Sequence, residues 1–464
     1  SYTWDIGNRL HATEDGLTGR RVRYDYDEFD NLLSAEYKQG NDVEFIYRIP
    51  DRIGNLFETR EKDDRKYDAG GRLTEDRDYF YHYDCEGNLV FKEFRTLDWA
   101  GVSVPLGGQK THLEEELGIT FRAFGAGWRY DWQSDGMLSR VVRPDGKEVS
   151  FAYDALGRRT EKTYEGVTTH FVWDGNVPLH EWQEIAADAG KADVTTWLFE
   201  QNTFIPAAKL AANGESFSIV SDYLGTPLQA FDNNGNKVWE QELDIFGRKR
   251  TGNNNSSFIP FKYQGQYEDV ETGLYYNRFR YYEPNIGTYI SQDPIGLVGG
   301  NPTLYAYVGS PNNWYDIFGL RPFGHAVGDI GEKAVINDLK KNGYEIIDVK
   351  YGSNNGIDVL AKSPSTGKYD AFEVKSSTVG KYNLSEYQLK PENFVRTRLE
   401  RAEVHGKITE ETRLDIMSNL GERKVAYVDI KRRDNGTLYA DSIRYESWDA
   451  ETKRKEKLKT GGHH

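Results

Sequence analysis

The sequence is poor in cysteine, methionine and proline, and the shortage of cysteine excludes whole classes of protein. Its 464 residues include 1 Cys, 2 Met and 14 Pro. The single Cys85 has no partner for an internal disulfide, and zinc or iron–sulfur sites built on cysteine need several thiolates. No apolar run approaches the roughly 18 residues that a membrane-spanning helix requires. Disulfide scaffolds and cysteine metal centres are therefore excluded, and no membrane span is expected.

A recognisable secretory leader is also missing, because residues 1–4 already belong to a patterned segment. We expect the chain to be part of a longer protein. The closing residues 461–464 read Gly-Gly-His-His and are interpreted as the remnant of a purification tag.

Tyrosine, glycine and acidic residues are abundant instead. There are 31 Tyr and 46 Gly, the net charge is -15, and the mean hydropathy is -0.74. Residues 1–320 carry a net charge of -18, whereas residues 321–464 carry +3. Because Lys and Arg make the contacts to phosphates, the first part is a poor candidate for binding nucleic acid, and the second part tolerates a polyanion.

A degenerate unit of aromatic-Asp-x-x-Gly recurs along the first 320 residues. The copies lie at Trp4–Leu10, Tyr67–Leu73, Tyr83–Leu89 and Tyr153–Arg158, with weaker copies at Tyr26–Asp27, Asp51–Leu56, Asp232–Asn236 and Asp244–Arg248. Between the copies, apolar and polar residues alternate, as strands with one buried face require. The Asp side chain can close a turn onto the backbone and the Gly supplies a positive φ. A single hairpin is marginally stable, so the pattern predicts hairpins stacked into a β-sheet shell.

These units resemble the YD repeats of the Rhs family, which includes the insecticidal toxin complex C proteins and, more distantly, the teneurins. The resemblance implies a mainly β shell of YD-repeat hairpins over residues 1–272, wound into a hollow cocoon. A carbohydrate-binding or cell-surface adhesion scaffold, which needs no chemistry, is the competing use of such a shell.

The segment from Gly273 to Leu297, followed by Asp316–Leu320, resembles the C-terminal core signature of Rhs proteins. The resemblance implies that residues 273–320 cut the chain between Leu320 and Arg321 in the manner of aspartyl proteases. Two carboxylates can share this work, one activating a water and the other, kept neutral, polarising the carbonyl.

The resemblance gives the acid roles to Asp293 and Asp316 and a supporting role to Arg280. Ile317 replaces the proline that is usual after the second acid, and Glu283 stands where Asp is commoner. The alternative is that both aspartates only initiate turns.

Residues 321–460 change in character. Apolar spacing predicts a helix over 329–342, followed by strands over 345–350, 356–361 and 369–375, the last two joined by a polar turn at 363–368. Residues two apart on a strand share a face, so Glu373 and Lys375 are expected to point together. If the strands pair across the turn, Asp358 lies beside them. Two carboxylates and a lysine are the minimum for metal-assisted hydrolysis of a phosphodiester.

This pattern resembles the PD-(D/E)XK nucleases, which implies a small α/β restriction-endonuclease-like fold and a DNA endonuclease dependent on Mg²⁺ or Mn²⁺. The implied metal ligands are Asp358, Glu373, the carbonyl of Val374 and, from the first helix, Glu332. Lys375 and Gln388, expected on a later helix, complete the implied catalytic set.

Together the resemblances imply an Rhs-type antibacterial toxin whose shell encloses, cuts and releases the nuclease. They further imply a cognate immunity protein, a delivery apparatus such as a type VI secretion spike, and action in the cytoplasm of a target cell. The alternatives are a toxin domain directed at RNA, an inactive domain that only binds nucleic acid, or the adhesion scaffold.

Overall fold

The structure is a computed structural model that divides into two compact units. One unit comprises residues 1–16, 27–30 and 323–464, and the other residues 17–26 and 31–322. The structure describes the chain except residues 6–8, 17, 28–30, 98–101, 103, 106–107, 186–192, 201–202, 253–256, 300–302, 321–322, 350–356, 378–389, 405, 433–437 and 461–464, and except the side chains of residues 251–252, 298–299, 323–330, 432, 438–439 and 455–460.

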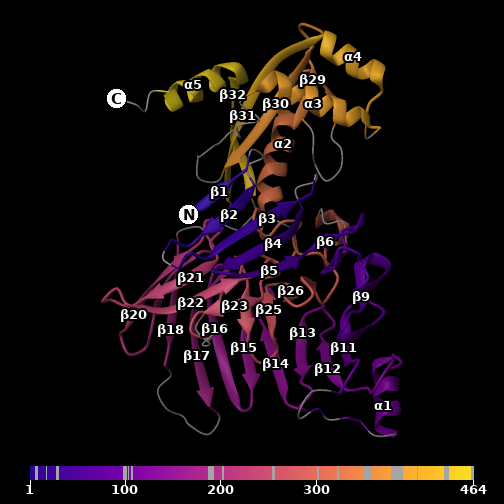
Figure 1. Ribbon diagram of the computed structural model, residues 1–464, viewed down its shortest axis with the longest axis vertical. Coiled ribbons are helices and arrows are strands. Elements are labelled where there is room, and N and C mark those ends of the chain that lie inside the picture. Colours follow the sequence, from indigo (N-terminus) through magenta and orange to yellow (C-terminus); the bar gives the residue numbers. More distant parts are fainter. Residues whose placement is uncertain are drawn as a thin grey trace. The chain divides into compact units, whose positions relative to one another are not determined.

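The larger unit is built on an antiparallel sheet of 16 strands, in which each strand pairs with its neighbours in sequence (Figure 1). Its strands are β8 (Lys66–Asp68), β9 (Arg72–Glu75), β10 (Tyr79–Tyr83), β11 (Leu89–Phe94), β12 (Gly127–Trp132), β13 (Leu138–Val142), β14 (Glu148–Tyr153), β15 (Arg159–Tyr164), β16 (Val167–Asp174), β17 (Val177–Ile185), β18 (Thr195–Phe199), β19 (Pro206–Leu210), β20 (Ser216–Ser221), β21 (Pro227–Phe231), β22 (Lys237–Leu243) and β23 (Lys249–Gly252). Helix α1 (Gly108–Leu117) lies between β11 and β12. The predicted array of stacked hairpins is confirmed.

The YD turns have the predicted chemistry. In the turn at Asp154, the backbone N–H of Gly157 donates to the Asp154 carbonyl at 2.9 Å. The Asp154 Oδ1 accepts from the N–H groups of Leu156 and Arg158, each at 2.9 Å. Gly157 has φ +72°, a conformation that glycine adopts without strain. The same set of bonds recurs at Asp84, Asp222, Asp232 and Asp244.

The remaining strands of this unit form further ladders. They are β3 (Arg21–Tyr26), β4 (Leu32–Gln39) and β5 (Asp42–Tyr47), paired in that order; β6 (Ile49–Pro50) with β7 (Leu56–Phe57); and β24 (Tyr267–Asp269), β25 (Leu274–Asn277), β26 (Arg280–Glu283) and β27 (Thr288–Tyr289), again in order. All these pairs are antiparallel.

Residues 267–320, which we call the plug, pack against the large sheet. Leu274, Tyr276 and Tyr281 of the plug share one buried cluster with Leu138 and Val149 of the sheet. Polar groups are buried there in pairs: Arg159 Nη1 lies 2.6 Å from Asp269 Oδ2. The plug therefore supplies the apolar partner that a long single sheet needs on one face.

The other unit has an N-terminal hairpin and a small α/β fold. The hairpin pairs β1 (Tyr2–Trp4) with β2 (Leu10–Glu14). The α/β part consists of α2 (Phe323–Lys341), β28 (Glu345–Ile347), β29 (Val359–Lys362), β30 (Tyr369–Ser377), α3 (Pro391–Val404), α4 (Glu410–Ser418), β31 (Leu420–Arg432), β32 (Leu438–Ser447) and α5 (Trp448–Thr460). The five strands β28 to β32 form one sheet in sequence order, antiparallel except for the parallel pair β30–β31.

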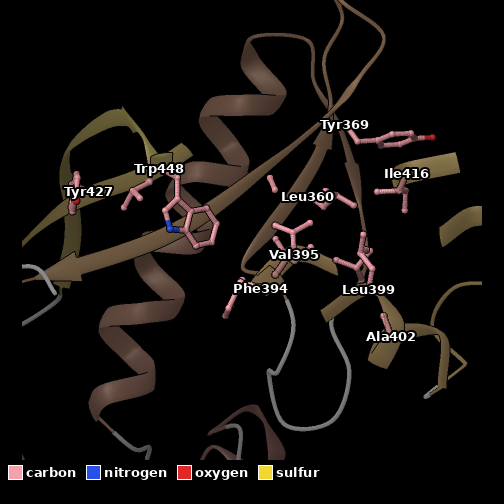
Figure 2. Packing of buried hydrophobic residues seen from close by; sticks show 13 residues of the cluster. Leu360, Tyr369, Phe394, Val395, Leu399, Ala402, Ile416, Tyr427 and Trp448 are labelled. Carbon is pink, nitrogen blue, oxygen red and sulfur yellow. The ribbon is translucent and has the colours of Figure 1, made fainter. Parts of the chain in front are cut away.

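The two faces of this sheet carry different cores. Val335 and Leu339 of α2 pack with Phe372 and Val374 on one face. On the other face, Ala371 packs in a cluster shared with α3, α4 and Trp448, which Figure 2 shows. Alternate residues of β30 therefore point to opposite helices, as strand geometry requires. No helix among the described residues is long and apolar enough to cross a membrane.

Candidate functional site

Asp358 lies directly before β29 rather than within a strand, which corrects the prediction of a strand over 356–361. Pairing of β29 with β30 ends at Val359 opposite Phe372. Two residues further along β30, the backbone N–H of Val374 donates to Asp358 Oδ2 at 2.7 Å. The carboxylate thus replaces the next backbone acceptor, and the two strands separate at this point. The predicted pairing across the turn at 363–368 is confirmed, and it brings Asp358 beside β30.

Glu373 and Lys375 share one face of β30, as predicted. Lys375 Nζ lies 2.9 Å from Glu373 Oε1. The Glu373 side chain is 3% exposed and the Lys375 side chain 22% exposed, so the pair opens to solvent only through the lysine. A buried carboxylate that leads to a partly exposed cation is typical of a binding site rather than of a solvated charge pair.

The charges of the three groups are coupled. Burial raises the pKa of Glu373 to about 8, with repulsion from Asp358 adding to the shift and the Lys375 ammonium opposing it. The pKa of Lys375 is raised because the attraction of Glu373 and Asp358 outweighs the effect of its burial. At neutral pH the site therefore holds a proton on Glu373 that a bound cation would displace.

The donor set fits a hard divalent cation. Two carboxylates and a backbone carbonyl at the point where β29 and β30 separate are oxygen ligands, which Mg²⁺ and Mn²⁺ prefer. The raised pKa of Glu373 reflects its burial first and repulsion from Asp358 second, and a bound cation would offset both. Within the described ranges, no three His, Cys, Asp or Glu side chains cluster closely enough to hold a metal. The fit therefore rests on Asp358, Glu373 and the carbonyl of Val374.

Glu332 and Gln388 were predicted to complete this site. Glu332 lies on α2 beside Gly331, where an added Cβ would come within 1.7 Å of Ser376 Oγ. By strand alternation Ser376 points to the α2 face and Glu373 to the opposite face. The structure thus places Glu332 over the end of β30 but on the helix that covers its other face, and its metal role stays a prediction. Gln388 lies outside the described residues.

A second cluster of charged residues is buried in the plug. Arg280 Nη2 lies 3.1 Å from Asp293 Oδ2 and 3.5 Å from Asp316 Oδ2. Burial raises the pKa of Asp293, and the Arg280 charge opposes that shift, while Asp316 adds to it. The structure therefore brings together the two acids and the supporting arginine that the resemblance assigns to cleavage.

Asp316 reaches the predicted cleavage site directly. The backbone N–H of Leu320 donates to Asp316 Oδ1 at 3.1 Å. Arg280 Nε donates to the carbonyl of Gly319, and Ile295 N–H donates to Asp293 Oδ1 at 3.0 Å. Both aspartates close turns and also face the guanidinium, so the two readings of these residues are compatible. Arg321 lies outside the described residues.

Tyr289 and Asn277 belong to the second cluster and were not predicted. The Tyr289 hydroxyl donates to Asp316 Oδ2 at 3.0 Å, and Asn277 Nδ2 donates to the Tyr289 hydroxyl at 3.0 Å. The Arg280 guanidinium lies 3.7 Å from the centre of the Tyr289 ring. Among 31 tyrosines in the sequence nothing marks this one, because its role depends on pairing between β26 and β27.

Comparison with known proteins identifies a family that this chain matches. A family model described as Teneurin YD-shell matches residues 53–298, more than half of the chain. The match includes β8 to β27 and ends before the α/β part.

Several bacterial proteins, two of them named as toxins, are similar in sequence. Double-stranded DNA deaminase toxin A of Burkholderia cenocepacia is 29% identical over 350 residues, which is 69% of this chain and 22% of that protein. Probable deoxyribonuclease RhsB of Dickeya dadantii is 29% identical over 289 residues, 61% of this chain and 17% of that protein. Toxin protein Tse5 of Pseudomonas aeruginosa is 31% identical over 338 residues, 69% of this chain and 25% of that protein. The chain thus spans a quarter or less of the length of these relatives.

Solved structures of Tc toxins are also similar. The Photorhabdus luminescens Tc holotoxin pore matches 69% of this chain and 19% of that chain, with 18% identity and a TM-score of 0.37. The TcdB2-TccC3 crystal structure matches 69% of this chain and 19% of that chain, with 18% identity and a TM-score of 0.35.

Proposed function

Since the chain belongs to the Teneurin YD-shell family, we propose that it acts as an Rhs-type antibacterial toxin with a toxin domain in residues 321–460. The relatives support this role, because they are named as toxins or as DNA-modifying enzymes. The two whose names give an activity differ, one being a deaminase and the other a deoxyribonuclease, although each matches at least 61% of this chain. The activity of the toxin domain must therefore be inferred from its own residues.

We propose that this activity is Mg²⁺-dependent cleavage of DNA. The observation that carries the proposal is the coupled group of Asp358, Glu373 and Lys375 at the point where β29 and β30 separate. When bound, Mg²⁺ would neutralise charge on a phosphate and lower the pKa of a water. Asp358, Glu373 and the Val374 carbonyl would hold it. DNA is proposed over RNA because the pattern of Asp358, Glu373 and Lys375 resembles that of nucleases that mostly cleave DNA.

The chain's own residues divide the remaining work. Glu373 would release its proton to solvent on binding a cation, because the cation would offset the burial and the repulsion from Asp358 that raise its pKa. Lys375 keeps its proton near neutral pH, since its pKa is raised. It would therefore donate a hydrogen bond to a phosphate oxygen or to the attacking water, and it would not serve as the general base.

The plug is proposed to cut the chain after Leu320. Asp293, with its raised pKa, is the group that would be protonated and donate to the scissile carbonyl, and Asp316 would activate the water. Arg280 would hold the two carboxylates together, since it contacts both. A delivery apparatus, a cognate immunity protein and action in the cytoplasm of a target cell complete the proposal.

Digestion of supercoiled plasmid by the purified full chain tests the nuclease. We expect nicking and linearisation with Mg²⁺, none with EDTA, and none with Asp358→Ala. A folded RNA is incubated in parallel to separate the two nucleic acids. Intact plasmid and intact RNA, with a native circular dichroism spectrum, would contradict the nuclease and favour the adhesion scaffold. Cleavage of RNA alone would favour an RNA-directed toxin domain.

A further inference from the structure

Residues 316–320, here called the tail, are bound along the turn between β25 and β26. The Asn277 side-chain amide donates to the Asp316 carbonyl at 2.7 Å. The backbone N–H of Phe279 donates to the Phe318 carbonyl at 3.2 Å. Arg280 Nε donates to the Gly319 carbonyl. Residues in and beside one tight turn thus donate hydrogen bonds to three carbonyl groups of the tail, and these bonds fix the position of the tail's backbone.

The turn itself is firmly held. Asn277 pairs with Arg280 across the hairpin, which leaves only two residues in the turn. Arg278 has φ +63°, a left-handed conformation that costs a residue with a side chain about 1 kcal/mol or more. Arg278 Nη2 donates to the carbonyl of Leu156 at 3.0 Å and anchors the turn to the large sheet. Strain that the surroundings maintain is common at functional sites.

One close approach prevents the tail from sliding, and a second confines its backbone from the other side. Gly319 has φ +65°, and an added Cβ would lie 2.6 Å from the Asn277 carbonyl oxygen. A shift by one residue in either direction would place Phe318 or Leu320 at that point, and both have a Cβ. On the other side, a Cβ on Gly265 would lie 2.5 Å from the Ile317 carbonyl oxygen. The tail therefore fits this channel in one register.

A small cavity beside the tail favours the same register. Its volume is about 40 Å³, and Phe318, Ile317, Phe204 and Phe261 are among its lining residues. The ring of Phe318 packs edge-on against Phe204, with 5.8 Å between the ring centres. A shift of one residue would bring Gly319 or Ile317 to the position of Phe318 and lose this contact.

We propose that the 277–280 turn and Gly265 act as a ruler that sets which bond of the chain is cut. The bond that is cut follows the fourth residue after Asp316, because the tail is held in one register. The side chains of Leu320 and Arg321 do not determine the choice of bond. Asn277, Gly265 and Phe318 are positioning residues in this scheme. The inference rests on the proposed self-cleavage.

Single-residue insertions test the ruler in the full chain. With an alanine inserted between Gly319 and Leu320, we expect the cut to follow the inserted alanine, because it now lies four residues after Asp316. With an alanine inserted between Leu320 and Arg321, the cut stays after Leu320. Leu320→Ala is expected to be cut at the same bond as the parent chain. Intact-mass measurement of the N-terminal fragment locates each cut.

The outcomes separate the two proposals. If the parent chain is never cut, and so behaves like Asp316→Asn, both self-cleavage and the ruler are refuted. A cut that follows Leu320 in the first insertion overturns the ruler and leaves self-cleavage intact. If that insertion prevents folding, Gly319→Ala decides: we expect cleavage to be at least tenfold slower or spread over several bonds. An unchanged rate and a single unchanged bond would overturn the ruler.

Discussion

Lys375 Nζ lies 2.9 Å from Glu373 Oε1, on the same strand and two residues away. The pair forms within β30 itself, whereas Asp358 joins it from across the turn through the N–H of Val374. Lys375 and Asp358 are both partly exposed, whereas Glu373 is buried, so a substrate would meet the lysine and Asp358 first.

Replacing Lys375 by alanine should abolish most of the DNA cleavage. Loss of a cation that contacts the phosphate or the attacking water typically lowers the rate by 10²–10⁴-fold. Initial rates of plasmid nicking at saturating Mg²⁺ measure the effect. Lys340→Ala, at an exposed position of α2, is the matched control and should keep the parent rate. Equal rates for Lys375→Ala and Lys340→Ala would remove Lys375 from the site.

Glu373→Gln should change how the stability of the metal-free protein depends on pH. The pKa of Glu373 is about 8 in the folded protein, above its usual value of 4.5, so the folded state binds this proton more tightly. The free energy of unfolding therefore falls as pH rises from about 4.5 to about 8, by an amount on the order of a few kcal/mol. Gln cannot ionise and should remove this loss.

Urea unfolding in EDTA at pH 6 and pH 8.5, followed by a signal from the α/β unit, provides the measurement. The midpoint of the parent should be lower at pH 8.5, and that of Glu373→Gln should change much less. Glu345→Gln, at an exposed position of β28, is the control. Identical pH dependence in the parent and in Glu373→Gln would show that Glu373 ionises normally.

Self-cleavage should slow as pH rises. Asp293 has a raised pKa, and its protonated form is the one that can donate to the scissile carbonyl, so the active form is lost as pH rises through this pKa. Asp293→Asn should be at least 100-fold slower. Fragment formation on gels from pH 5 to pH 9 measures both effects, with Asp232→Asn in an exposed turn as control. A rate that increases with pH would assign the opposite protonation state to Asp293.

Two turn glycines should differ in their tolerance of alanine. Gly87 and Gly146 both have a positive φ, of +83° and +81°. An added Cβ at Gly146 meets nothing within 4 Å, whereas at Gly87 it would lie 2.7 Å from the hydroxyl of Tyr305. Gly146→Ala should therefore cost about 1 kcal/mol for the backbone conformation. Gly87→Ala should cost about 1–3 kcal/mol more through overpacking.

Denaturation midpoints of the larger unit compare these two variants. The Tyr305 hydroxyl donates to the Gly87 carbonyl at 2.7 Å, so the plug cannot withdraw without losing this bond. Equal midpoints for the two alanine variants would mean that the plug does not pack on this turn as described.

Features that depend on neighbouring residues could be predicted from the sequence. The YD turns, the shared face of Glu373 and Lys375 and the helix at α2 follow from local spacing. The turn at Asp222 was missed because Ser221, and not an aromatic residue, precedes it. Helix α2 begins at Phe323 rather than near 329. The sequence misplaces this start because no strong capping residue marks it.

Long-range features could not be derived in this way. Asp358 lies outside β29 because its carboxylate accepts a hydrogen bond from the N–H of Val374. This bond depends on how the two strands pair. Glu332 matches the first-helix part of the nuclease pattern. The packing of Val335 and Leu339, however, determines which face of the sheet its helix covers. Arg280, Asp293 and Asp316 are well separated in the sequence, and the fold of the plug brings them together. Only the family resemblance could therefore group them in advance.

The plug has a consequence for the order of events during synthesis. The large sheet pairs each strand with its neighbour in sequence, whereas the plug bonds to residues far earlier, as between Arg48 and the carbonyl of Gly309. Contacts between neighbours form early, and contacts across hundreds of residues form late. The two carboxylates lie in this late-folding part of the chain, so the proposed cut would come at the last step of assembly. Scission would thus report a finished shell.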